Sequence, residues 1–118
     1  MREQKFRKLV VWSKAMDFIE LIYKTTHKFP SSEIYGLTSQ IRRASTSIAL
    51  NIAEGSGSGT DKEFCRFLSI ALRSSYEVVC GVEVAKRLNY CSSNESDILL
   101  KLCDELSAMI TGLKKSIS

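Results

Sequence analysis

The stretch Gly55-Ser56-Gly57-Ser58-Gly59-Thr60-Asp61-Lys62-Glu63 divides the 118-residue chain into two helical halves. Glycine is favoured just after a helix, so Gly55 predicts the end of one helix, and the residues up to Gly59 predict a flexible connector. Thr60 followed three residues later by Glu63 has the pattern of a capping box, which opens the next helix. Because the connection is short, the two flanking helices are expected to be antiparallel neighbours.

Apolar residues recur at helical spacing on both sides of this connector and predict four amphipathic helices. Their expected bounds are about residues 9–28, 34–54, 61–89 and 93–115. Phe29-Pro30 ends the first helix, because the residue before a proline avoids the helical region. A second capping box, formed by Ser92 and Glu95, opens the fourth. The pattern predicts an all-α, antiparallel up-down-up-down four-helix bundle that occupies residues 1–118 as a single domain.

The same periodicity assigns residues to the inner and outer faces of the helices. In the fourth helix the expected inward residues are Ile98, Leu102, Leu106, Met109, Ile110 and Leu113. On the second helix, small residues are expected on an exposed face, namely Thr46, Ala49 and Ala53.

The composition restricts the class of protein. A chain of 118 residues fits one compact domain. No apolar run approaches the ~18 residues that a membrane span needs. The run Leu9-Val10-Val11-Trp12 is also shorter than the roughly 7–15 apolar residues of a signal peptide. We therefore expect a cytoplasmic protein without a membrane partner.

The sequence has few residues suited to catalysis or metal binding. Its four cysteines lack the C-x₂₋₄-C spacing of zinc sites. The single histidine, His27, has Lys24 three residues before it, which excludes the Glu-x-x-His motif of di-iron bundles. The glycine-rich connector lacks the Gly-Lys-Ser/Thr sequence of a P-loop. We expect no enzyme activity, and hence no catalytic residue, cofactor or metal.

Basic residues suggest a polyanionic partner. Residues 1–53 contain nine Lys or Arg and four Asp or Glu, whereas residues 54–118 contain eight and nine. The candidate nucleic-acid-binding residues lie on the second and third helices: Arg42, Arg43, Lys62, Arg66, Arg73 and Arg87. With Lys5, Arg7 and Lys8 they supply enough charge to contact the phosphate backbone of structured RNA or DNA. The alternative is that this charge serves only solubility, since Glu63 and Glu77 neutralise part of it.

Two helix surfaces favour self-association. The apolar arc of the first helix is wider than a bundle helix with two neighbours needs, and the polar stripe of the second helix is short-chained. The candidate oligomer-interface residues are Trp12, Met16, Tyr23, Gln40, Ser47, Asn51 and Glu54. We expect both surfaces to be partly buried between subunits. The alternatives are a solvated polar face and a docking surface for a protein partner.

Several strings of residues, taken together, are similar to a known family. They are Leu9-Val10-Val11-Trp12, Glu33-Ile34-Tyr35-Gly36-Leu37, Gln40-Ile41-Arg42-Arg43-Ala44 and Asn51-Ile52-Ala53-Glu54-Gly55. The chain resembles the four-helix bundle family named after proteins encoded in intervening sequences of bacterial 23S ribosomal RNA genes. The residues that match its motif positions are Gln40, Arg42, Arg43, Asn51, Glu54 and Glu77. The family has no established catalytic residues.

This resemblance implies a ring-like homopentamer whose biochemical role is largely unassigned. A related branch, the accessory proteins of diversity-generating retroelements, forms basic pentameric barrels that bind reverse transcriptase and nucleic acid. From the resemblance and the basic residues we expect a non-catalytic homopentamer that binds structured RNA or DNA. The alternative is a structural or adaptor module that binds a protein partner and has no nucleic-acid role.

Overall fold

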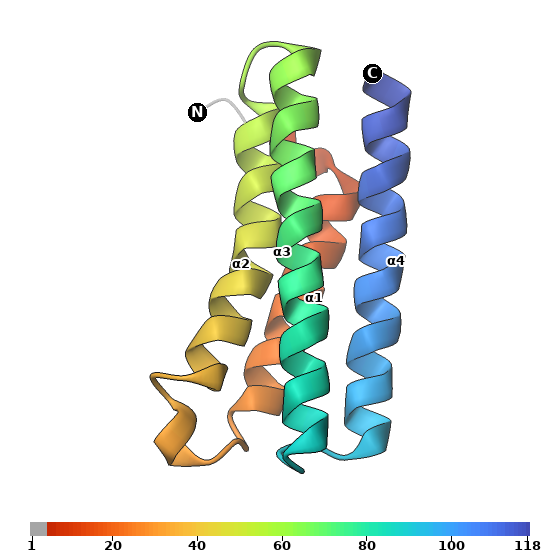
Figure 1. Cartoon of the computed structure of the whole chain (residues 1–118). Helices are drawn as coiled ribbons and strands as arrows, with labels where there is room; N and C mark the ends of the chain where they lie inside the picture. Colours follow the sequence, from red (N-terminus) through yellow and green to blue (C-terminus); the bar gives the residue numbers. More distant parts are fainter. Residues whose placement is uncertain (1–4) are drawn as a thin grey trace.

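The computed structural model describes residues 5–118, which fold into four long helices (Figure 1). In chain order the elements are η1 (Lys5–Lys8), α1 (Val10–Thr26), η2 (Ser31–Glu33), α2 (Leu37–Ser56), α3 (Asp61–Arg87) and α4 (Ser93–Ile117), where η1 and η2 are 3₁₀ helices. Successive helices run in opposite directions, and α1 packs on α2, α2 on α3, α3 on α4, and α4 on α1. The predicted antiparallel bundle is confirmed.

The second helix differs from its predicted bounds at both ends. It begins at Leu37 rather than at 34, because Ser31–Glu33 forms a separate 3₁₀ turn and Gly36 has non-helical dihedral angles (φ −114°, ψ −115°). It continues to Ser56, so Gly55 lies inside its last turn and does not follow its end. Gly55 is needed there because a Cβ would lie 2.8 Å from Phe64 Cδ1.

The other helices keep the predicted order with small shifts at their ends. The first and third end two residues early, at Thr26 and Arg87, and the fourth extends to Ile117. After the third helix, Asn89 adopts a left-handed conformation (φ 62°), and the Tyr90 N–H donates to the Ala85 carbonyl at 2.9 Å. This hydrogen bond, from residue 90 back to residue 85, is the one that defines a Schellman-type helix end.

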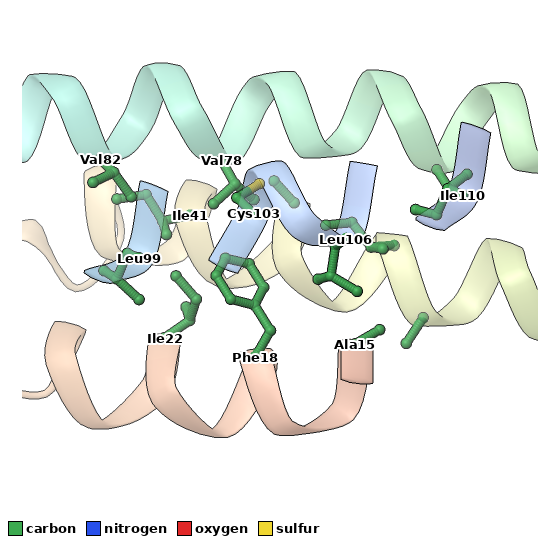
Figure 2. Packing of buried hydrophobic residues seen from close by; sticks show 14 of the residues in the cluster. Ala15, Phe18, Ile22, Ile41, Val78, Val82, Leu99, Cys103, Leu106 and Ile110 are labelled. Atoms are coloured by element: carbon green, nitrogen blue, oxygen red, sulfur yellow. The ribbon is translucent and has the colours of Figure 1, made fainter. Parts of the chain in front are cut away.

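The core lies along the bundle axis and receives side chains from all four helices. Phe18 and Ile22 of α1 point toward Ile41 of α2, Val78 of α3 and Leu106 of α4 (Figure 2). All five are at most 3% exposed. Burial of large apolar side chains of this kind stabilises the fold by about 1.5–3 kcal/mol each.

Two predicted face assignments were wrong. Ile98 is 46% exposed, and the apolar side chains that α4 buries are Leu99, Cys103, Leu106 and Ile110. Cys103, which is 1% exposed, was not among the predicted inward residues, so the predicted inner face of α4 was turned toward Ile98. Ala49, expected on an exposed face, is buried because η1 and α1 both pack against α2.

The α2–α3 pair is closely packed because small residues face its seam. A Cβ on Gly81 would lie 2.6 Å from Ile41 Cγ1, so only glycine allows this approach. The hydroxyls of Ser47 and Ser74 are hydrogen-bonded across the seam at 2.8 Å. This seam positions the exposed edges of α2 and α3 relative to each other.

Candidate functional site

The structure does not bring the six predicted nucleic-acid-binding residues together. Arg42 lies on the flank of α2 that faces α1: its Nε donates to Thr26 Oγ1 at 2.9 Å, and its guanidinium carbon lies 4.5 Å from the centroid of the Tyr23 ring. Arg43 lies on the other flank and lines a groove between α2 and α3. Arg42 therefore joins two helices of its own chain, while Arg43 faces a different surface.

The other four residues, Lys62, Arg66, Arg73 and Arg87, are exposed along α3. Arg66 is paired with Glu63, with its Nη2 and Nε 3.0–3.2 Å from the carboxylate oxygens, and its guanidinium also stacks on Phe67 at 4.6 Å. The hydrogen bonds from Arg66 lower the pKa of Glu63 and raise the pKa of Arg66 itself. This pair directs the guanidinium along the helix surface.

One end of the bundle concentrates positive charge. There η1, the α2–α3 connector and the end of α4 meet around a cavity of about 310 Å³, lined by Lys5, Thr60 and Ile117 among others. The connector and the end of α4 lie together at the top of Figure 1. Cys65 Sγ also lies 3.7 Å from the Lys114 carbonyl.

We call this region the basic end. Its basic side chains are Lys5, Arg7, Lys8, Lys62, Arg66, Lys114 and Lys115, and the carboxylates beside them are Glu54, Asp61 and Glu63. Seven positive and three negative side chains give an excess of four, which equals the net charge of the whole chain, +4. The basic end therefore differs electrostatically from the rest of the described bundle.

Only part of the basic end was predicted from the sequence. Lys62 and Arg66 were candidates, and Lys5, Arg7 and Lys8 were expected to support them. Lys114 and Lys115 were missed. The helix topology could have identified them, because in an up-down-up-down bundle the end of the fourth helix lies beside the start of the third.

The predicted interface surface on α1 is partly covered by its own chain. Trp12 packs edge-on against Phe6 of η1, with ring centroids 4.9 Å apart, and is half-buried. Met16 and Tyr23 remain 41% and 42% exposed. Phe6 thus covers the Trp12 end of this apolar surface and leaves the remainder accessible.

The predicted interface surface on α2 has two kinds of residue. Ser47 bonds to Ser74, and the Asn51 amide donates to the Ser47 carbonyl oxygen at 2.8 Å, so both belong to the α2–α3 seam. Gln40 and Glu54 are exposed. Gln40 and Ser47 also border the groove that contains Arg43.

We call this depression, of about 590 Å³, the α2–α3 groove. Its lining residues are Leu37, Gln40, Ile41, Arg43, Ala44, Ser47, Glu77, Cys80, Gly81 and Val84. Gly81 and Ala44 leave room above the seam, Arg43 supplies a cation and Glu77 a carboxylate. Arg43 was predicted to bind nucleic acid, and Gln40 and Ser47 were predicted to lie at an oligomer interface. Cys80, Gly81 and Val84 were not predicted for this surface, because they become neighbours of α2 only through helix packing.

No group of three or more His, Cys, Asp or Glu side chains among residues 5–118 is placed to hold a metal ion. None of the helices formed by these residues combines the length and apolar character needed to cross a bilayer.

Comparison with known proteins identifies the family. No curated protein matches the chain. A crystal structure of a protein with unknown function from the S23 ribosomal protein family of Bacteroides thetaiotaomicron VPI-5482 is similar, with a TM-score of 0.81, 25% sequence identity, and coverage of 90% of this chain and 99% of that one. The family model for the 23S rRNA-intervening sequence protein matches residues 7–112, a range that reaches into all four helices. The chain belongs to the family of 23S rRNA-intervening sequence proteins.

Proposed function

We propose that this protein is a non-catalytic homo-oligomer, pentameric in its assembled form, that binds nucleic acid through the basic end. The observation that carries the proposal is the excess of four positive charges in one region of the bundle. The pentamer is what the family resemblance implies. Arg42, which is engaged with Thr26 and Tyr23, is assigned a structural role instead of a phosphate contact.

Lysine and arginine at the basic end would contact phosphates and release their counterions. Such contacts supply affinity and position, but they contain little sequence information. We therefore expect binding to structured RNA and duplex DNA with a strong dependence on salt. In a closed cyclic assembly the copies of the basic end lie on one circle, so several would engage the same polyanion.

The test compares two double variants with the same change in net charge. Lys62→Glu/Lys115→Glu reverses two charges at the basic end, and Lys24→Glu/Lys101→Glu reverses two exposed lysines on α1 and α4 away from it. Fluorescence anisotropy with an RNA hairpin and a DNA duplex measures Kd over a range of salt concentrations. Circular dichroism checks that each variant is folded.

We expect wild-type log affinity to fall linearly with log salt. The Lys62→Glu/Lys115→Glu slope should be smaller in magnitude by about 1.8, from about 0.9 for each lost phosphate contact. The Lys24→Glu/Lys101→Glu slope should match that of the wild type. A flat wild-type dependence, or an equal loss in both double variants, would contradict the proposal. If the affinity of the wild type did not depend on salt, the alternative function, a module that binds a protein partner, would be favoured.

A further inference from the structure

We propose that Tyr35 of one copy inserts into the α2–α3 groove of the next copy, and that this contact builds the assembly. The inference rests on the self-association in the proposed function and names the surfaces that would form it. The partner is a second copy of this chain, since both halves of the contact are present on it.

Tyr35 is an exposed aromatic side chain on a well-anchored segment. It is 95% exposed, the largest exposed fraction among the large apolar side chains of residues 5–118, and Ile34 beside it is 47% exposed. Glu33, two residues before Tyr35, accepts hydrogen bonds from the Leu37 N–H at 3.1 Å and from the Tyr90 hydroxyl at 2.9 Å. Because these bonds fix the segment between α1 and α2 (orange in Figure 1), docking of Tyr35 would order little additional chain.

The groove offers what a tyrosine side chain requires. Its volume of about 590 Å³ is in the usual range for pockets that enclose a ligand. Ile41, Ala44 and Val84 provide apolar lining, and Arg43 provides a guanidinium for the aromatic ring. The Glu77 carboxylate can accept a hydrogen bond from a phenol hydroxyl. Elsewhere in residues 5–118, arginine already lies over aromatic rings in three places, at Phe6, Tyr23 and Phe67.

Charge complementarity favours a second copy as the occupant. Two charged side chains line the groove, the cation Arg43 on α2 and the carboxylate Glu77 on α3, and both are exposed. This surface has no net charge, unlike the basic end, so two copies can approach without net repulsion. Arg43 of one copy can then meet a carboxylate of its neighbour, and Glu77 a cation.

The position of Tyr35 favours a ring. Leu37, two residues later, lines the groove, so Tyr35 lies at the end of the groove and does not fill it. A projection of one copy that enters the groove of the next makes a heterologous contact. Such contacts form a closed ring where the rotation between copies closes.

The first test removes the projection. In Tyr35→Ser the fold should persist, since the ring is 95% exposed, and light scattering should show loss of the oligomer toward the 13.2 kDa chain. Tyr76→Ser, a change at another exposed tyrosine (67%), is the matched control and should keep the wild-type mass. Maleimide should label Cys80 in the groove slowly in the wild type and rapidly in Tyr35→Ser.

The second test separates the two halves of the contact. Cys80→Arg fills the groove and leaves Tyr35 intact, whereas Tyr35→Ser leaves the groove open. Each variant alone should have the mass of one chain. An equimolar mixture should form a two-chain complex, because one projection and one groove remain compatible.

The outcomes distinguish this inference from the proposed function. If the wild type is oligomeric and Tyr35→Ser has the same mass, the Tyr35 contact is wrong while self-association stands. If the wild type has the mass of one chain at micromolar concentration, both are wrong. Formation of the two-chain complex only in the mixture supports the contact, and a mixture that stays as single chains overturns it.

Discussion

The close approach of α2 and α3 can be tested by Gly81→Ala. The new Cβ would lie 2.6 Å from Cγ1 and 3.2 Å from Cδ1 of Ile41, which is 1% exposed and has little room to move. Replacing a helical glycine by alanine gains about 1 kcal/mol in helix propensity. Overpacking costs about 1–3 kcal/mol. We expect a net loss of stability of up to about 2 kcal/mol.

A double-mutant cycle isolates the contact. Ile41→Ala alone should cost about 2–5 kcal/mol through the cavity it leaves. In that background Gly81→Ala meets no side chain at Cγ1 and should stabilise by about 1 kcal/mol. The coupling free energy between the two positions is then about 1–3 kcal/mol. Urea denaturation followed by circular dichroism, at one fixed chain concentration, measures all four proteins.

Gly112→Ala in α4 is the matched control. A Cβ at Gly112 meets nothing within 4 Å, so this change should stabilise by about 1 kcal/mol. If Gly81→Ala stabilised the wild type as much as Gly112→Ala does, the close helix approach would be refuted. The α2–α3 groove would then need a different geometry.

The remaining predictions concern a helix end, a carboxylate and a thiol. Asn89→Gly should keep or increase stability, whereas Asn89→Ala should lose about 1 kcal/mol in urea denaturation, since φ is 62°. Hydrogen bonds, first from the Leu37 N–H and then from the Tyr90 hydroxyl, lower the pKa of Glu33 below its ordinary 4.5. Its stabilising contribution is therefore present above that value and is lost as the pH falls through the lowered pKa. Urea midpoints measured from about pH 6 to about pH 3 should thus fall less in Glu33→Gln than in the wild type. Burial raises the pKa of Cys103 to about 11, so mass spectrometry should find its thiol labelled by maleimide only in urea.

The fold was predictable because local signals agreed with one another. The Thr60 and Ser92 caps, the Phe29-Pro30 stop and the apolar periodicity all specify four helices with short connections. The predicted end of α2 at Gly55 was wrong because this glycine is required by tertiary packing: Phe64 lies where a side chain on residue 55 would be. The error at Ile98 arose because Cys103 was not counted as a core residue.

The surfaces were less predictable than the fold, because they depend on which helix edges meet. Arg42 and Arg43 are adjacent in sequence, yet they face α1 and α3 respectively. Lys62 and Lys115 are 53 positions apart in sequence, yet they lie at the start of α3 and the end of α4, which meet at one end of the bundle. Neither fact can be obtained from spacing within a single helix.

The basic end and the α2–α3 groove have different roles in this account. The first has excess positive charge and suits a polyanion, while the second is balanced in charge and partly apolar and suits another copy. Because they involve different residues, charge reversal at the basic end should leave the oligomeric mass unchanged. Tyr35→Ser should weaken nucleic-acid binding only through the loss of neighbouring copies.

The most direct measurement is the mass of the freshly purified protein together with its absorbance at the nucleic-acid and protein maxima. The account predicts a particle of five 13.2 kDa chains with bound nucleic acid that a high-salt wash removes. A single-chain mass with the absorbance of protein alone, before any wash, would contradict it.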